Sequence, residues 1–555
     1  MNERPWHKHY DPGVPATIDY PDVPLFHFLE DMACQVPDNP CTVFRDQVIR
    51  YGEMNDLVNR LSASLVASGL KQGSRVGLVL PNIPQFVLAY YAILKAGGVV
   101  VAMNPAYKQR ELEFQATDSE IEVLIGSGSA AQLLQTVRDR LGLRELILTH
   151  LEDAFEMAGW AREPAVSHPP DQESGFRWLR DLVLAQSPGS RAEVQVSADD
   201  MAILQYSGGT TGTPKGAVGL HRNLVANSLM FRRWLAGLVD GKESTLMAIP
   251  MYHVYGMVVG MSVSILLGAK MVLIPDPRNL ENLLRNIETY QTSFFPGVPT
   301  MYAMINQFPD VQAGKYNLRS IRACISGSAP LPKEVKERFE RLTGAQLMEG
   351  YGLSEAPTAT HCNPMFGEKR TGSIGLPLPD VDCQIISLED GKTLLPTGEV
   401  GELLIRSPQV MQGYYNQPEE TEKTLQGGWL RTGDIARMDA DGYFYIVDRK
   451  KDMLKVSGFT VWPREIEQII AGHPKVLDVS VAGVPDPIRG EVPKAWIVLQ
   501  PGENLDRQEI IDWCKEALVY YKVPAQVEFL DALPRTLVGK VLRRELVRQH
   551  LAQKS

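Results

Sequence analysis

Cysteine is scarce in this 555-residue chain, which contains only 6, and no two of them have Cys-x-x-Cys spacing. This scarcity excludes a disulfide scaffold and a cysteine-rich zinc site, and we expect a reducing, cytoplasmic setting. Basic residues are also in deficit, because 56 Lys and Arg stand against 66 Asp and Glu, for a formal net charge of −10. General binding of nucleic acid needs a basic footprint, so we predict no nucleic-acid partner.

Long apolar runs are missing as well. The N-terminus has no apolar segment typical of a secretory signal. Residues 244–269 lack Asp, Glu, Lys and Arg but contain Pro250 and His253. We expect this stretch to form a buried strand, a turn and a buried helix rather than a membrane span. Peripheral contact with a membrane and formation of a homodimer both stay open.

The chain has the composition of a large globular protein, with 44% hydrophobic and 22% charged residues. Short apolar runs alternate with amphipathic stretches over the first two thirds of the sequence. One helix face carries Leu57, Leu61 and Leu65, and a strand at 76–80 precedes a helix at 86–95. This βαβ rhythm predicts parallel sheets, arranged as two α/β lobes.

The pattern changes after Gly375. Gly, Pro and alternating strands dominate residues 383–447, including an expected half-buried strand at 401–406, and predict a small β-rich unit. A charged run at 448–452 follows, and the remaining residues are numerous enough for another domain. We therefore predict an α/β protein with a large N-terminal domain (1–448) of two α/β lobes plus the β-rich unit. A small, mobile α+β C-terminal domain (449–555) follows a hinge at the charged run.

The strongest local motif is Tyr-Ser-Gly-Gly-Thr-Thr-Gly-Thr-Pro-Lys-Gly at residues 206–216. Its glycines let the backbone wrap, its hydroxyls donate hydrogen bonds and its lysine supplies a cation, as a polyphosphate requires. The Walker spacing is not met, because Pro214 precedes the lysine and Gly216 follows it. The predicted phosphate-binding loop comprises Ser207, Gly208, Gly209, Thr210, Thr211, Gly212 and Lys215.

This loop resembles the signature of the acyl-adenylate-forming (AMP-binding) superfamily, which includes acyl-CoA synthetases, adenylation domains of peptide synthetases and beetle luciferases. Further motifs of that superfamily follow in order as Met-Glu-Gly-Tyr-Gly-Leu-Ser-Glu (348–355), Arg-Thr-Gly-Asp (431–434), Asp-Arg-Lys-Lys-Asp (448–452) and Pro-Arg-Thr-Leu-Val-Gly-Lys (534–540). Ser354 stands where the family usually has Thr, so the hydroxyl is retained. The chain looks most like a fatty-acyl-CoA synthetase (long-chain-fatty-acid–CoA ligase), which implies ATP, Mg²⁺ and coenzyme A.

The chemistry of adenylation agrees with this resemblance. Attack of a carboxylate on the α-phosphate develops negative charge, so cations and hydroxyl donors must be preplaced around it. Lys215, Thr210 and Lys540 are the candidates, and the resemblance implies that Lys540 bridges the acyl carboxylate and the phosphate. A carboxylate beside a triphosphate is a plausible Mg²⁺ ligand, and we assign Glu355 and Thr210 to that ion.

The resemblance also assigns the nucleotide and coenzyme A contacts. Asp434 would accept hydrogen bonds from the ribose hydroxyls, although turn statistics alone favour an ordinary Asx turn equally. Arg449 would contact the nucleotide, Lys451 matches the hinge position, and Gly458 lies in a segment similar to the pantetheine tunnel. The remaining predicted nucleotide-binding residues are Gly327, Ser328, Ala329, Pro330, Tyr351, Gly352 and Ser354.

Residues 250–257 match the family segment that borders the acyl pocket. Amino-acid-activating relatives place an Asp there to pair the substrate ammonium, and this chain has none. His253 is predicted to approach the substrate carboxylate or gate the pocket. The apolar residues here suit an aliphatic tail, although each suits a buried core helix equally well; they are Met251, Val254, Met257, Val258, Val259 and Met261.

The expected substrates are therefore a medium- or long-chain fatty acid, ATP and coenzyme A. One alternative is an aryl or branched-acid CoA ligase, or a ligase that loads a carrier protein. The motifs also allow a luciferase-like oxidase of the adenylate. A non-enzymatic ATP-binding relative is disfavoured by the intact Glu355, Asp434 and Lys540.

Overall fold

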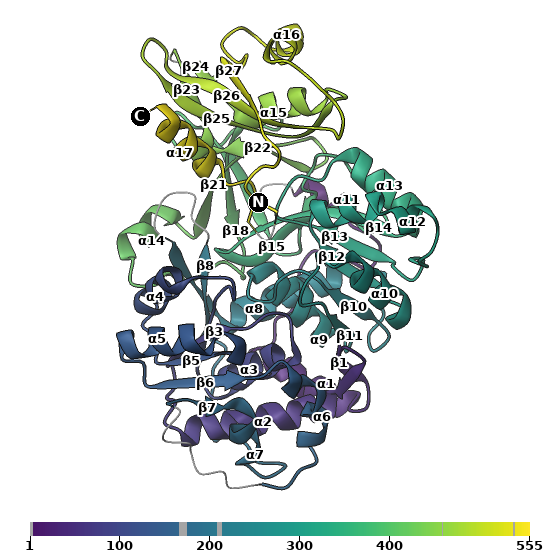
Figure 1. Ribbon diagram of the computed structural model, residues 1–555, viewed down its shortest axis with the longest axis vertical. Helices are drawn as coiled ribbons and strands as arrows, with labels where there is room; N and C mark the ends of the chain where they lie inside the picture. Colours follow the sequence, from purple (N-terminus) through teal and green to yellow (C-terminus); the bar gives the residue numbers. More distant parts are fainter. Residues whose placement is uncertain (1–3, 166–174, 208–213, 458, 537–538, 555) are drawn as a thin grey trace.

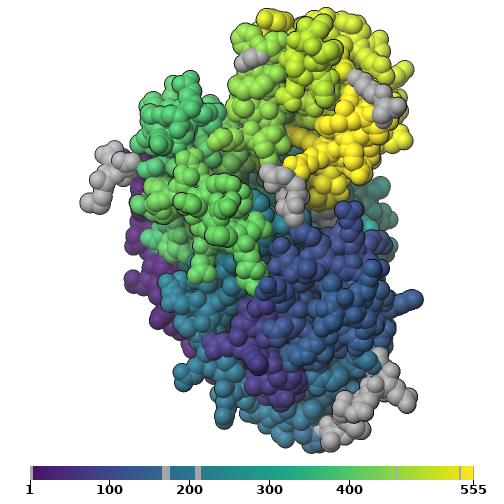
Figure 2. Space-filling view, turned by 90° about the vertical axis from the view of Figure 1, so that its left-hand side faces the viewer, coloured from purple at the N-terminus to yellow at the C-terminus, as the bar shows by residue number. Residues whose placement is uncertain are grey.

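The computed structural model describes residues 4–165, 175–207, 214–457, 459–536 and 539–554. Two large sheets with their helices form the N-terminal body, a β-rich sheet lies above them, and a smaller C-terminal domain caps one end (Figure 1). The C-terminal domain stands out as a separate lobe in the space-filling view (Figure 2). This arrangement confirms the α/β fold class with a small α+β C-terminal domain.

The first α/β lobe is built on a mixed sheet. Its strands, in spatial order, are β19 (Gly413–Tyr414), β9 (Lys215–Leu220), β8 (Met201–Ser207), β4 (Val99–Ala102), β3 (Arg75–Val79), β5 (Val123–Ser127), β6 (Glu145–Thr149) and β7 (Arg177–Trp178). The central strands β4, β3, β5 and β6 run parallel, whereas β9 is antiparallel to β8. The predicted βαβ rhythm is confirmed, because the wholly buried helix α3 (Pro84–Lys95) connects β3 to β4.

The second lobe contains the other large sheet. Its strands, in spatial order, are β16 (Leu376–Pro377), β15 (Ala356–Cys362), β14 (Gln346–Leu353), β13 (Ala323–Ser326), β12 (Phe294–Gly297), β10 (Ser244–Met247), β11 (Lys270–Leu273), β1 (Pro40–Phe44) and β2 (Gln47–Arg50). The strands from β14 to β1 are parallel, so their carboxyl ends meet at one edge of the sheet.

The uncharged stretch between β10 and β11 forms a turn and a buried helix, as predicted. Its first part is a π-helix, η4 (Gly256–Ser262), which continues into α9 (Val263–Leu266). Gly256 is required at the start, because a Cβ there would lie 2.2 Å from the carbonyl oxygen of Pro250. No helix in the described part of the chain is long and apolar enough to cross a membrane.

Helices cover both large sheets and fill the core between the lobes (Figure 1). The predicted apolar face of Leu57, Leu61 and Leu65 is buried on α2 (Tyr51–Ala67). The remaining helices of the body are short 3-10 turns or amphipathic α-helices. They are η1 (Pro5–His9), α1 (His27–Gln35), α2 (Tyr51–Ala67), α4 (Gln109–Asp118), η2 (Gly128–Ala130), α5 (Ala131–Leu141), η3 (Glu152–Phe155), α6 (Met157–Trp160), α7 (Leu179–Leu184), α8 (His221–Trp234), α10 (Leu280–Tyr290), α11 (Pro299–Gln307), α12 (Pro309–Gln312) and α13 (Lys333–Thr343).

The β-rich unit contains β17 (Asp382–Ile386), β18 (Gly401–Arg406), β20 (Leu425–Gln426), β21 (Trp429–Met438) and β22 (Phe444–Arg449), with α14 (Pro418–Thr424) beside them. The expectation of a half-buried strand at 401–406 was wrong, because every residue of β18 except Arg406 is buried. Glu402 tolerates burial since its carboxylate pairs with Arg431 at 3.1 Å and Lys450 at 2.9 Å.

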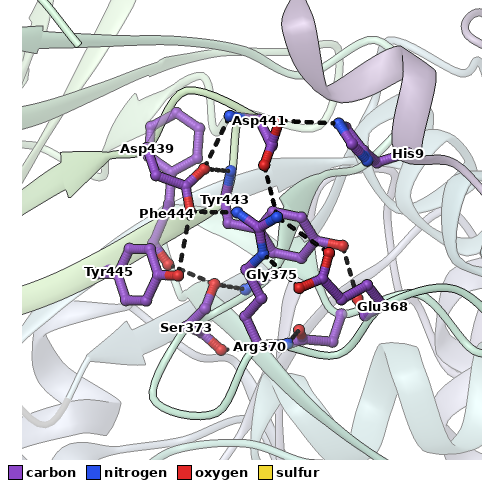
Figure 3. Close-up of polar contacts among 11 residues, drawn as sticks. His9, Glu368, Arg370, Ser373, Gly375, Asp439, Asp441, Tyr443, Phe444 and Tyr445 are labelled. Carbon is purple, nitrogen blue, oxygen red and sulfur yellow. Dashed lines mark hydrogen bonds and ion pairs between the residues drawn. The ribbon is translucent and has the colours of Figure 1, made fainter. Parts of the chain in front are cut away.

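An arginine fixes the turn of the β21–β22 hairpin (Figure 3). Arg370 donates to Asp439 at 2.7 Å, to Asp441 at 2.6 Å and to both carboxylate oxygens of Glu368 at 3.0 Å. Its guanidinium also lies 4.2 Å from the ring centroid of Tyr443. We call these five residues the Arg370 cluster. It anchors the hairpin turn to the loop that precedes β16.

The C-terminal domain is a mixed sheet flanked by helices. The chain enters it through the short helix η5 (Lys450–Asp452), and the elements that follow are β23 (Leu454–Val456), β24 (Phe459–Val461), α15 (Pro463–Ala471), β25 (Val476–Asp486), β26 (Gly490–Leu499), α16 (Arg507–Ala517), β27 (Gln526–Phe529) and α17 (Arg543–Lys554). The predicted boundary at 448/449 falls at the end of β22. After Lys540, helix α17 begins only at Arg543, because the Leu542 N–H first bonds back to the Pro534 carbonyl at 2.8 Å.

Candidate active site

A cleft of about 1060 Å³ lies where the two lobes, the β-rich sheet and the C-terminal domain meet. The first lobe contributes Lys215, the second contributes Tyr351, the β-rich sheet contributes Asp434 and the C-terminal domain contributes Lys540. These residues come from motifs that are widely separated in the sequence. Such a concave site with convergent polar groups is the default candidate for an active site.

Asp434 is the centre of a polar group on the β-rich wall of the cleft. Its buried carboxylate accepts a hydrogen bond from the Tyr351 hydroxyl at 2.5 Å and pairs with Arg449 at 3.3 Å. The β21–β22 pairing sets Asp434 directly opposite Arg449, and the Thr432 hydroxyl accepts from the Asp434 N–H at 3.0 Å. Burial and the Asp434 charge raise the pKa of Tyr351 well above its usual value, so its hydroxyl stays a donor.

Lys540 enters the cleft from the C-terminal domain. Its own N–H donates to the Thr536 hydroxyl at 3.1 Å, which fixes the backbone that carries it. Burial, followed by the charges of Arg449 and Lys451, lowers the pKa of Lys540 to about 7. Among the described residues, no carboxylate lies within ion-pair distance of its amine. This lysine is therefore a partly buried cation that an anionic ligand would stabilise.

His253 lies near Lys540. Burial, followed by the positive charge of Lys540, lowers the pKa of His253 to about 4, so the ring is neutral at pH 7. Its Nδ1 accepts a hydrogen bond from the Tyr255 N–H at 3.2 Å. A neutral imidazole that accepts at Nδ1 carries its proton on Nε2, so His253 presents a donor at that nitrogen.

Lys215 and Glu355 are joined through Tyr414. The Tyr414 hydroxyl donates to Glu355 Oε1 at 2.9 Å, and the amine of Lys215 lies 5.2 Å from the Tyr414 ring centroid. Lys215 also pairs with Glu420 at 2.5 Å, and hydrogen bonds from Lys215 and Lys423 lower the pKa of Glu420 to about 2. The sequence motifs gave no sign of this pairing, since α14 lies far along the chain.

The other predicted nucleotide-binding residues divide into three groups. Gly327, Ser328, Gly352 and Ser354 line the cleft, whereas Ala329 and Pro330 do not. Ser207 ends β8, and its backbone pairs with Lys215. The remaining predicted positions lie outside the described residues; they are Gly208, Gly209, Thr210, Thr211, Gly212 and Gly458.

The segment predicted to border the acyl pocket reaches the cleft only in part. Val254 and Val259 line the cleft. The core alternative holds for the others, because Met251, Met257, Val258 and Met261 pack within a buried hydrophobic cluster. Sequence patterns cannot separate the two fates, since both favour apolar residues. Tyr252 and Tyr255 of the same predicted segment also line the cleft. The aromatic cleft residues that the sequence analysis missed are Tyr107 and Phe231.

Comparison with known proteins decides the family. Residues 29–415 match the family model described as AMP-binding enzyme, and residues 465–540 match the AMP-binding enzyme C-terminal domain. The chain belongs to the AMP-binding enzyme family. A long-chain-fatty-acid–CoA ligase of Bacillus subtilis strain 168 is 38% identical over 555 residues, covering 99% of this chain and 98% of the relative.

Solved structures of AMP-binding enzymes have the same architecture. ATP-bound MatB from Rhodopseudomonas palustris is similar with a TM-score of 0.83 and 28% identity, covering 96% of this chain and 99% of that one. A benzoate CoA ligase from Burkholderia xenovorans LB400 is similar with a TM-score of 0.82 and 25% identity, covering 95% of this chain and 100% of that one.

Proposed function

We propose that this AMP-binding enzyme activates a medium- or long-chain fatty acid as acyl-AMP and then transfers the acyl group to coenzyme A. The carrying observation is Lys540, a partly buried cation without a carboxylate partner among the described residues, facing the Asp434–Arg449 pair across one cleft. Relatives named long-chain-fatty-acid–CoA ligases, such as that of Bacillus subtilis, support the choice of acid and acceptor.

In the first step, the fatty-acid carboxylate attacks the α-phosphorus of ATP. A new carboxyl O–P bond forms, the bond from the α-phosphorus to the bridging oxygen breaks, and pyrophosphate leaves. Asp434, held by Tyr351 and Arg449, would accept from the ribose hydroxyls. Lys540 and Lys215 would stabilise the negative charge that develops on the phosphate oxygens.

The residues present fit Mg²⁺. Glu355 lines the cleft, and its Oε1 is oriented by the Tyr414 hydroxyl, while no hydrogen bond from a described residue reaches its Oε2. Mg²⁺ is usually held by one or two carboxylates together with substrate phosphates. Glu355 would hold the ion with Thr210, which lies outside the described residues. The ion would offset the charge of the triphosphate and of the departing pyrophosphate.

In the second step, the thiol of coenzyme A attacks the acyl carbonyl carbon. A C–S bond forms, the bond from the acyl carbon to the AMP oxygen breaks, AMP leaves, and the thiol proton is released to solvent. Because Lys540 occupies the cleft beside the reacting carboxylate, the C-terminal domain has to move before the thiol enters. We place that movement at residues 448–452, with Lys451 as the hinge and Gly458 beside the entering pantetheine.

A screen of pyrophosphate release over straight-chain acids tests the substrate. Catalytic efficiency should rise by about 0.8 kcal/mol, or roughly fourfold, for each additional buried methylene until the pocket is full. Equal turnover of acetate and dodecanoate, or robust activation of amino acids, would contradict the proposal. Faster turnover of benzoate, or preference for a holo carrier protein over coenzyme A, would favour the alternative ligases.

A cytoplasmic location, peripheral contact with a membrane and a homodimer remain predictions from the sequence. Sedimentation with anionic lipid vesicles tests the membrane contact. Light scattering coupled to size-exclusion chromatography tests the homodimer, and a mass of about 62 kDa would correspond to the monomer of 61.7 kDa.

A further inference from the structure

A second arginine connects the two sides of the predicted hinge. Arg543 begins α17, shortly after Lys540. Its Nη1 lies 2.8 Å from Asp452 and 3.7 Å from Asp448, and its Nη2 donates to both carboxylate oxygens of Glu467 at 2.8 Å. Asp448 and Asp452 flank the hinge lysine on opposite sides. One arginine therefore faces an acid on each side of the hinge.

Asp448 differs from the other two acids, because it is on the N-terminal side of the hinge. It ends β22 with Arg449, and its buried Oδ2 accepts the Arg464 N–H of α15 at 2.8 Å. The Arg464 guanidinium in turn donates to the Ile446 carbonyl at 2.7 Å. Asp448 thus contacts α15 and α17, the two helices of the C-terminal domain nearest to the hairpin (Figure 1).

We propose that Asp448 is a positioning residue, an inference that rests on the proposed two-step function. Its contacts with Arg464 and Arg543 act as a latch, which holds the C-terminal domain in the orientation that keeps Lys540 in the cleft. Asp452 and Glu467 follow the hinge and move together with Arg543. The contacts of Asp448 must open before the second step.

The geometry lets this latch open without leaving Arg543 or Asp448 buried and without a hydrogen-bond partner. The Asp448–Arg543 pair is long, at 3.7 Å, and Arg543 keeps two shorter carboxylate partners when the pair breaks. Asp448 keeps the hydrogen bond from the Arg449 N–H at 2.8 Å, which belongs to its own strand. A buried ion that retains partners in both states does not incur the full penalty of an unpaired buried charge.

The test measures each half-reaction in single turnover on the same preparation of full-length enzyme. The first is pyrophosphate release from dodecanoate and ATP, and the second is acyl-CoA formation from supplied dodecanoyl-AMP. Asp448→Asn should lower kcat of the first about tenfold or more, with the KM for ATP unchanged within about twofold, because it displaces a catalytic group without removing a substrate contact. The second half-reaction should be unchanged or faster, and Asp448→Glu should recover most of the first.

Asp452→Asn is the matched control, since it removes the same charge from the same arginine on the other side of the hinge. Asp452 also raises the pKa of Lys540, so the comparison is made at pH 6, where the Lys540 amine stays largely protonated. Under that condition Asp452→Asn should leave the ratio of the two half-reactions unchanged. An equal loss of both half-reactions in Asp448→Asn, or a rise in the KM for ATP at constant kcat, would overturn the latch. Failure of the unaltered enzyme to make acyl-CoA from acyl-AMP would instead contradict the proposed function.

Discussion

The β21–β22 hairpin is held at both ends by an arginine, but the two ends connect different parts of the molecule. At the turn, the Arg370 cluster joins Glu368 to Asp439 and Asp441, all of which precede the predicted hinge (Figure 3). At the open end, Arg543 meets Asp448 on one side of the hinge and Asp452 on the other.

The two ends of the hairpin also have different surroundings: the turn end is covered by the N-terminal segment, and the open end lines the cleft. The N-terminal segment lies against the turn end, where Trp6 packs on Phe444 with ring centroids 6.2 Å apart and His9 lies 3.5 Å from Asp441. The open end carries Asp434 and Arg449, which line the cleft. We therefore expect the turn end to stabilise the fold and the open end, through the proposed latch, to control the geometry of a reaction step.

The largest effect is expected from removing Lys540, the cation that the proposed latch at the open end would keep in the cleft. Lys540→Ala should lower acyl-AMP formation by about 10² or more, because a preplaced charge at the developing oxyanion typically contributes that much. Thioester formation from supplied acyl-AMP should survive, which a rapid-quench assay of both half-reactions would measure. Normal adenylation by this variant would show that Lys540 is a charged residue of the cleft wall without a catalytic role.

The second-largest effect is expected on stability, when the Arg370 cluster at the turn end is disrupted. Arg370→Ala leaves three acidic side chains without their shared partner, and we expect the free energy of unfolding to fall by about 2 kcal/mol. The rates of both half-reactions per folded molecule should stay equal to those of the unaltered enzyme at moderate temperature. Denaturant unfolding and single-turnover assays on one preparation measure the two quantities.

Arg406→Ala is a control for the Arg370 substitution. Arg406 also pairs with a carboxylate, Asp382 at 3.1 Å, and stacks on Trp429, but its side chain is 55% exposed. An exposed pair of this kind contributes about 0 to 1 kcal/mol. Selective loss of adenylation in Arg370→Ala would show that the turn end also positions the cleft, and the distinction between the two ends would fail.

The sequence predicted the parts of this molecule that depend on local pattern. The βαβ rhythm predicted the parallel strands, and the motifs led to Asp434, Lys540 and Tyr351, which the structure brings to one cleft. The change of composition after Gly375 predicted the β-rich sheet. These features repeat a short spacing or a short motif, so they do not depend on distant parts of the chain.

The contacts that the sequence did not predict join residues far apart in the chain. Lys215 meets Glu420, and His9 meets Asp441, only because the sheets bring their strands and loops together. The burial of Glu402 within β18 depends on Arg431 and Lys450, which lie on other elements. An alternating pattern therefore predicts the strand but not how deeply it is buried.

The smallest expected effect is a shift in the pH dependence of adenylation, which should differ between substitutions of the neighbouring lysines Lys451 and Lys450 at the open end. The protonated amine of Lys540 is the form that stabilises negative charge, and its pKa of about 7 means that it loses the proton as pH rises through neutrality. The kcat/KM of adenylation, which reports the free enzyme, should therefore fall above about pH 7. The charge of Lys451 is one cause of that lowered pKa, so Lys451→Gln should move the fall to higher pH.

The shift should be less than about one pH unit, because burial and Arg449 act more strongly on Lys540 than Lys451 does. The control is Lys450→Gln, which removes a positive charge that is already paired with Glu402 at 2.9 Å. The strongest charges acting on Lys540 are those of Arg449 and Lys451. The control should therefore stay closer to the midpoint of the unaltered enzyme than Lys451→Gln does. The measurement is the pH profile of pyrophosphate release at limiting ATP for all three proteins. Equal shifts in both variants would mean that the general charge of the hinge, rather than the place of Lys451, sets the protonation of Lys540.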